Sequence, residues 1–211
     1  MKLRPTLIAL ALAAAVSPAY AQDDDARAES DTRAIDTRAQ ENVARSNTQV
    51  NTDAARGAML NDGQILQVVR TLNDGEIKQA EEALDEGESD AVKSVAEMIK
   101  TDHEMSNEKM DALLDGELNL EDSPLNETLS MQSEDTHELL QDLSGTQYDC
   151  AYLEQQVVQH EAAIELSKTQ LMPNAKDPGV KDFLAAKGPT LERHLQMAKD
   201  AMGSASCTAA R

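Results

Sequence analysis

From residue 62 onward, apolar side chains recur every three or four residues, which is the spacing of one buried helical face. Glycines, prolines and capping residues interrupt this pattern and predict where helices begin and end. The alternation of apolar and polar residues that is typical of strands does not occur. The pattern predicts four long helices and one shorter connector, over residues 62–86, 90–116, 124–144, 146–172 and 178–202.

Short turns join the first helix to the second and the fourth to the fifth, so each pair should form an antiparallel hairpin. The connector, over residues 124–144, should carry the chain back along the bundle. The predicted fold is therefore an all-α, ferritin-like four-helix bundle of two antiparallel hairpins with an additional connector helix.

Each long helix carries a polar residue at the middle of its apolar face. These residues are Glu76, His103, His160 and His194. In an antiparallel hairpin, residues equidistant from the turn lie at one level, because both helices rise by about 1.5 Å per residue. Glu76 should therefore face His103, and His160 should face His194, with all four side chains in one layer.

Three imidazoles and one carboxylate are the donors of a mononuclear site acceptable to zinc, iron, manganese or copper. Asp102, Glu104 and Glu161 adjoin these histidines, but neighbouring helical residues point about 100° apart, so orienting roles suit them better. The four central residues could instead bond to one another as a metal-free polar layer that fixes helix register. The sequence leaves both interpretations open.

Ferritin-type di-iron chemistry requires several inward carboxylates and a Glu-x-x-His pair on each of two helices. The chain has one such pair, Glu134 and His137, which lies on the connector, where we expect it to be solvated. The sequence has neither a Gly-x-Ser-x-Gly motif nor a glycine-rich phosphate loop, and neither cysteine has a histidine at a useful spacing. The pattern therefore gives no positive indication of catalysis.

The two cysteines lie near the points where the chain enters and leaves the second hairpin. Cys150 is at the start of the fourth helix and Cys207 follows the end of the fifth. An antiparallel hairpin places these ends together, which predicts an intramolecular disulfide in an oxidising compartment. Pairing between two molecules through the C-terminal tail is the alternative.

The first 21 residues have the pattern of a secretory signal peptide, with a basic start, an apolar stretch and a cleavage signal at Ala19-Tyr20-Ala21. The segment that follows is polar and predicts a disordered acidic tether. No later segment approaches the ~20 apolar residues of a membrane span, so we expect export to the periplasm or the extracellular space. The expected parts are a signal peptide (1–21), a tether (22–61), a helical bundle (62–203) and a tail (204–211).

The chain has a formal net charge of −20, and removal of Lys2 and Arg4 with the leader would make it −22. Such a charge repels nucleic acid, which we exclude as a partner. A solvated acidic surface that maintains solubility is the simpler interpretation, and adaptation to high salt is the alternative. The sequence identifies no protein partner.

Four stretches together carry a resemblance to a known family. They are AEMIKTDH (96–103), LSGTQYDCAYL (143–153), QHE (159–161) and PTLERHL (189–195). Their combination resembles a widespread bacterial family of exported ferritin-like proteins, which is catalogued as a domain of unknown function and often labelled membrane or outer-membrane protein. The resemblance covers roughly residues 63–202 and supplies no established activity. It implies the fold, the export and the family's acidic and histidine positions at Glu76, Asp102, His103, His160 and His194.

Three functional classes follow from these observations. The one we favour is an exported bundle that binds a single metal ion or small ligand through its internal His/Glu layer. The second is a non-catalytic envelope or stress-related structural or interaction protein with a metal-free polar layer. The third is a ferritin-type redox enzyme, which would need two metal ions per chain.

Overall fold

The computed structural model describes residues 59–205 and 207. The predicted signal peptide (1–21), the predicted tether up to residue 58 and most of the predicted tail lie outside this part. All regular structure in the described residues is helical, and none of these helices has both the length and the apolar character needed to cross a membrane. The elements are α2 (Asp62–Glu86), α3 (Asp90–Leu114), α4 (Pro124–Gln141), α5 (Gly145–Leu166), the π-helix η1 (Ser167–Leu171), the single turn α6 (Met172–Asn174) and α7 (Pro178–Ser204).

Side chains cap the first turns of four of these helices. Asn61 and Ser123 each form a capping box with the residue three positions later, at the starts of α2 and α4. Ser89 and Asp177 each accept one backbone hydrogen bond, at the starts of α3 and α7. The four predicted helix starts therefore agree with the structure.

The apolar core includes one residue that precedes α2. Leu60, which the sequence reading assigned to the tether, is 6% exposed and packs in the apolar core. Burial of this large apolar side chain, together with the cap at Asn61, holds the chain against the bundle just before α2 begins.

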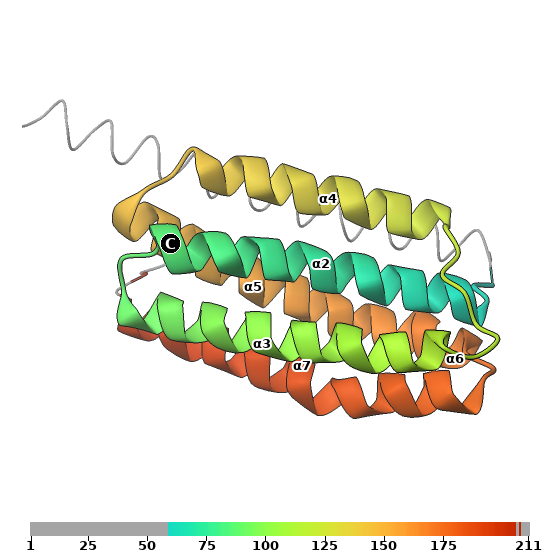
Figure 1. Cartoon of the computed structure of the whole chain (residues 1–211). Coiled ribbons are helices and arrows are strands. Elements are labelled where there is room, and N and C mark those ends of the chain that lie inside the picture. The colour runs from blue at the N-terminus through green and yellow to red at the C-terminus, as the bar shows by residue number, and fades with distance from the viewer. Residues whose placement is uncertain (1–58, 206, 208–211) are drawn as a thin grey trace, which may run out of the picture.

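The helices pack as a bundle of two hairpins. α2 pairs with α3, and α5 pairs with α7, while α3 also packs against α7. α4 packs along α2 on the outside of the bundle, as Figure 1 shows, and carries the chain back so that α5 begins beside the α2–α3 turn. The all-helical architecture and the two hairpins agree with the prediction.

Each hairpin contributes one carboxylate that binds the turn of the other hairpin. Asp149, near the start of α5, accepts hydrogen bonds from two backbone N–H groups of the α2–α3 turn, at 2.9 and 2.8 Å. At the opposite end, Asp62 in the first turn of α2 accepts bonds from two backbone N–H groups just before α7, at 2.8 and 3.1 Å. The axial position of one hairpin against the other is therefore held at both ends.

A polar layer divides the core into two apolar clusters. One cluster lies toward the α7 start and includes Ile65, Val69, Met110, Leu171 and Leu184. The other lies toward the α5 start and includes Val92, Ile99, Tyr148, Tyr152 and Leu153. Between them, along all four bundle helices, lie the buried polar residues Asn73, Glu76, Gln79, His103, Ser106, Gln155, Gln156, His160 and His194.

The predicted helix over residues 146–172 is not one regular α-helix, because α5 continues into η1. The N–H of Met172 bonds to the carbonyl oxygen of Ser167, five residues earlier, as in a π-helix. Pro173 follows at once and has no N–H to continue the α-helical pattern. We attribute the wider turn to this missing donor.

The two cysteines meet where α5 begins and α7 ends. Their sulfur atoms are 2.09 Å apart and their Cα atoms 5.3 Å apart. The pair is at disulfide distance within one chain, which is the arrangement that the hairpin geometry predicted.

Candidate metal centre

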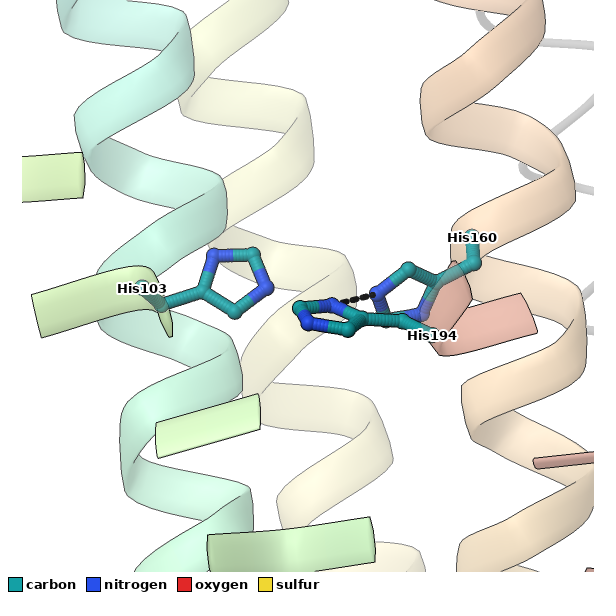
Figure 2. A group of neighbouring side chains, drawn as sticks. All are labelled: His103, His160 and His194. Carbon is teal, nitrogen blue, oxygen red and sulfur yellow. Dashed lines mark hydrogen bonds between the residues drawn. The ribbon is translucent and has the colours of Figure 1, made fainter. Parts of the chain in front are cut away.

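Three histidines from three helices converge in the middle of the polar layer. His103 lies on α3, His160 on α5 and His194 on α7, and their side chains point toward one another in Figure 2. Their relative exposures are 4%, 1% and 0%. One ring nitrogen from each histidine lies within 4.8 Å of those from the other two. Among the described residues, this is the one group of histidine, cysteine or acidic side chains with such a geometry.

The hydrogen bonds of His160 and His194 assign their ring protons. Nδ1 of His160 donates to the backbone carbonyl of Gln156 at 2.9 Å, because a carbonyl can only accept. Nε2 of His194 donates in the same way to the Asp102 carboxylate at 2.7 Å. In the neutral rings, the remaining nitrogens, Nε2 of His160 and Nδ1 of His194, therefore carry lone pairs. These two atoms face each other at 3.1 Å (Figure 2).

A chain of amides assigns the proton of His103. The Asp74 carboxylate accepts from Nδ2 of Asn107 at 2.7 Å, so Oδ1 of Asn107 is free to accept from Nδ2 of Asn73, also at 2.7 Å. Oδ1 of Asn73 then faces Nδ1 of His103 at 2.8 Å and must accept its proton. Lys187, which can only donate, also contacts this oxygen at 3.2 Å. Nε2 of His103 is left as a buried lone pair with no protein partner among the described residues.

Each imidazole thus keeps one ring nitrogen with a lone pair, and one nitrogen from each ring lies within 4.8 Å of those of the other two. The outer nitrogen of each ring donates to an oxygen: an amide for His103, a backbone carbonyl for His160 and a carboxylate for His194. Histidines that bind metal ions are held in this way, with the second ring N–H bonded to a carbonyl or carboxylate. The arrangement can therefore bind a cation at its centre.

Burial keeps His103 and His194 in the neutral form that a metal ion requires. It lowers the pKa of His103 well below its usual 6.5, and electrostatic interactions with Lys187, His160 and His194 further oppose a proton on this ring. Burial also lowers the pKa of His194 to about 4, although the hydrogen bond to Asp102 opposes this shift. Both rings are therefore neutral at pH 7.

Asp102 orients His194 from the edge of the site. Burial alone would raise its pKa, but the hydrogen bonds from His194 and from Arg193, at 2.7 and 2.5 Å, lower the pKa of this carboxyl below its usual value. Asp102 is therefore ionised at neutral pH. The sequence reading gave this residue an orienting role, and the structure places it in contact with the ring nitrogen that such a role needs.

Glu76 lies in the same layer but outside the group of three nitrogens. Its Oε1 is 3.8 Å from Nδ1 of His160, the outer nitrogen, and Asn73 takes the position opposite His103 that was predicted for Glu76. The reason is the turn: Asn73 and His103 are equidistant from Glu88, the centre of the actual α2–α3 turn, whereas the prediction centred that turn between residues 89 and 90. Burial raises the pKa of Glu76, and the electrostatic interaction with the nearby His160 opposes this shift. Oε2 of Glu76 is buried and makes no hydrogen bond to another described residue.

A cavity of about 40 Å³ adjoins His103 and His160. Glu76, His103 and His160 contribute to its wall, together with Lys187 and the apolar side chains of both hairpins. The Lys187 ammonium group is partly buried and donates to Oδ1 of Asn73 and to Ser106. Burial lowers the pKa of Lys187 to about 8, so the side chain is mostly charged at pH 7.

The sequence identified the three histidines and Asp102, but not the groups that orient His103 and His160. Asn73 is an amide on an otherwise apolar helical face, and this signal could have identified it. Gln156 contributes a backbone carbonyl, which no residue type reveals. His137, expected to be solvated beside Glu134, is instead half-buried against α2, with Nδ1 bonded to Glu82 at 2.8 Å. That expectation was wrong because α4 packs closely along α2.

The fold and the site define an all-helical bundle with a buried histidine cluster. A family model described as Domain of unknown function (DUF4142) matches residues 44–201, well over half of the chain, and the protein belongs to this family. The predicted resemblance to a family of unknown function is confirmed. The chain has no match among the curated proteins and none among the solved structures.

Proposed function

We propose that this protein binds a single transition-metal ion between His103, His160 and His194. The observation that carries the proposal is that three buried imidazoles bring one nitrogen each to within 4.8 Å of the others, while the second nitrogen of each ring is hydrogen-bonded to an oxygen. Nitrogens within 4.8 Å of one another can close around an ion about 2.1 Å from each by small side-chain rotations.

A metal-free layer fits the same geometry less well. Two neutral rings would place the lone pairs of His160 and His194 against each other at 3.1 Å. A second proton on His194 would relieve this contact, but its pKa of about 4 opposes that proton at pH 7. His103 would still have an unpartnered buried nitrogen. A cation removes all of these costs at once, because each lone pair then has a partner.

The donor set indicates the class of ion. Three neutral imidazoles suit zinc, copper or iron, whereas calcium and magnesium require oxygen ligands. Asp102 and Glu76 lie near the site but act on the outer nitrogens of His194 and His160. The ion would therefore be held by nitrogen alone on the protein side, with at least one position left for another ligand.

We also propose that the bundle is ferritin-like and that the protein is exported. The two hairpins with a returning outer helix support the first statement. The signal-peptide pattern at residues 1–21 and the cysteine pair at disulfide distance support the second, because such pairs persist in oxidising compartments. Storage or oxidation of iron would need carboxylate bridges, which the histidine cluster does not supply.

Elemental analysis of the untagged, exported protein tests the metal site. The same protein, stripped with a chelator and reloaded with zinc, should bind about one ion per chain. His160→Ala and His194→Ala should each lose nearly all of this metal. His137→Ala is the matched control. The chain has four histidines, and His137 is the one that lies outside the cluster, on α4.

The outcome of this comparison separates the two interpretations of the polar layer. Less than about a tenth of an equivalent in the folded wild-type protein would overturn the metal site and leave a layer that fixes helix register. Equal losses in His137→Ala and His194→Ala would also overturn it, since the metal would then bind elsewhere. Circular dichroism of each variant shows whether the bundle remains folded.

A further inference from the structure

The cavity beside the histidines is placed to reach the free side of a bound ion. His103 and His160 contribute to its wall, whereas His194 does not, so the cavity lies on the side of the cluster away from His194. Its volume of about 40 Å³ is enough for a small molecule of about two or three heavy atoms. The π-helical turn borders the same space, because Ser167 and Leu171 also line it.

The charges around the site determine which kind of molecule fits. Asp102 is already matched by Arg193, whose guanidinium donates to it at 2.5 Å. The charged side chains that line the cavity are Glu76 and Lys187, which have opposite signs. Because these two charges cancel, they would leave the two positive charges of a divalent ion, held by neutral imidazoles, without a counter-charge. A buried charge of this kind favours an anionic partner.

Polar atoms for such a partner are present in the wall. An ammonium group has three N–H bonds, and Lys187 donates to Asn73 and Ser106, both on the hairpin opposite α7. Oε2 of Glu76 is buried and has no partner among the described residues. The cavity therefore offers one further donor and one acceptor beside the lone pairs of His103 and His160, and its other walls are mainly apolar.

We infer that the cavity binds a small monovalent inorganic anion, which completes the coordination of the metal ion and accepts a hydrogen bond from Lys187. This inference rests on the proposed metal site. Lys187 is a positioning residue here, because it would hold the anion at the ion without binding the ion itself.

Azide binding to the cobalt-loaded protein tests the inference. The visible absorption of Co²⁺ reports a change in its ligands, and azide is a linear anion of three atoms that suits the cavity. In the wild-type protein, azide should change the cobalt spectrum to saturation. Lys187→Met keeps the length of the side chain and removes the ammonium group, so it should weaken azide binding by about tenfold to a hundredfold.

Two matched controls separate the site from general effects. Lys181→Met removes the same charge from an exposed position of α7 and should leave azide binding unchanged. Ala163→Leu places a larger side chain in the cavity wall and should weaken azide binding while cobalt binding persists. Ala162→Leu makes the same change at the neighbouring position of α5, which does not line the cavity, and should behave as the wild type.

Each result has a separate meaning. If cobalt binds with one ion per chain but azide leaves its spectrum unchanged, the anion site is wrong and the metal site stands. The anion site is also wrong if Lys187→Met and Lys181→Met have equal effects, or if Ala163→Leu binds azide as the wild type does. A protein that binds no cobalt at all overturns both proposals.

Discussion

The position of one proton on each imidazole decides what the central nitrogens can bind. An oxygen that accepts from the outer nitrogen leaves the inner nitrogen as a lone pair, and removal of that oxygen would free the ring to change tautomer or to rotate. For His194 this oxygen belongs to Asp102, at the edge of the bundle. The metal affinity of the buried site should therefore depend on a side chain that does not touch the ion.

Asp102→Ala should weaken metal binding about tenfold to a hundredfold, because His194 loses the acceptor that fixes its tautomer. Competition with a chromophoric chelator measures this change in affinity. Arg193→Gln is the control, since it removes the other partner of Asp102 and leaves the bond to His194 in place. Equal losses in the two variants would contradict the acceptor role, because Arg193→Gln leaves the bond from His194 to Asp102 in place.

At the scale of the elements, the bundle depends on contacts between a helix start and the turn of the other hairpin. Asp149 and Asp62 make these contacts at opposite ends of the molecule. They fix the axial position of α2 and α3 relative to α5 and α7, and so the level at which the three histidines meet. A shift by one helical turn, about 5.4 Å, would separate their rings.

Asp149→Ala should lower the free energy of unfolding by about 2–3 kcal/mol, because a buried carboxylate that accepts two backbone hydrogen bonds is lost. Asp62→Ala removes the equivalent pair from a more exposed position, where water can replace the carboxylate, so its effect should be smaller. Urea unfolding of both variants gives the comparison. A loss below about 0.5 kcal/mol in Asp149→Ala would show that packing alone holds the turn.

At the scale of the whole molecule, an apolar cluster lies on each side of the polar layer, and one covalent link closes the second hairpin at its open end. The link between Cys150 and Cys207 joins the start of α5 to the chain after α7, over a sequence separation of 57 residues. Closing a loop of this length contributes about 4 kcal/mol in the chain-entropy model. This contribution offsets part of the cost of burying His103 and His194, whose rings stay neutral in the folded state.

The metal-free protein should lose stability as the pH falls from 6.5 to about 4. His194 has a folded pKa of about 4 and an ordinary value of 6.5, so the unfolded chain takes up a proton first and is favoured in this range. Between pH 6.5 and 5, this residue alone should remove on the order of 2 kcal/mol. His103, whose pKa burial also lowers, should add to the loss.

Urea unfolding of the chelator-treated protein at pH 7 and pH 5 measures this dependence. His194→Gln lacks one of the titrating groups and should show a smaller decrease between the two values. His137→Asn changes a histidine outside the cluster and should retain the full decrease. A stability that is constant or rises from pH 7 to pH 5 would contradict the neutral, buried state of the cluster.

The sequence by itself determined the helices, their starts and the presence of a polar layer at mid-depth. Helical periodicity and capping are local properties, so residues such as Ser89, Ser123 and Asp177 mark boundaries without reference to the rest of the fold. The meeting of His160 and His194 was also predictable, because these two residues are equidistant from Asp177, which lies in the turn between their helices.

Only the tertiary structure decided which side chains face one another in the other hairpin and what surrounds the histidines. A difference of one to two residues in the centre of the α2–α3 turn moved the partner of His103 by one helical turn, from Glu76 to Asn73. The carbonyl of Gln156, the position of Lys187 on the cavity and the π-helical turn likewise depend on helix rotation and axial shift. Periodicity does not specify these quantities to a fraction of a turn, because they arise from packing between segments that are far apart in the chain.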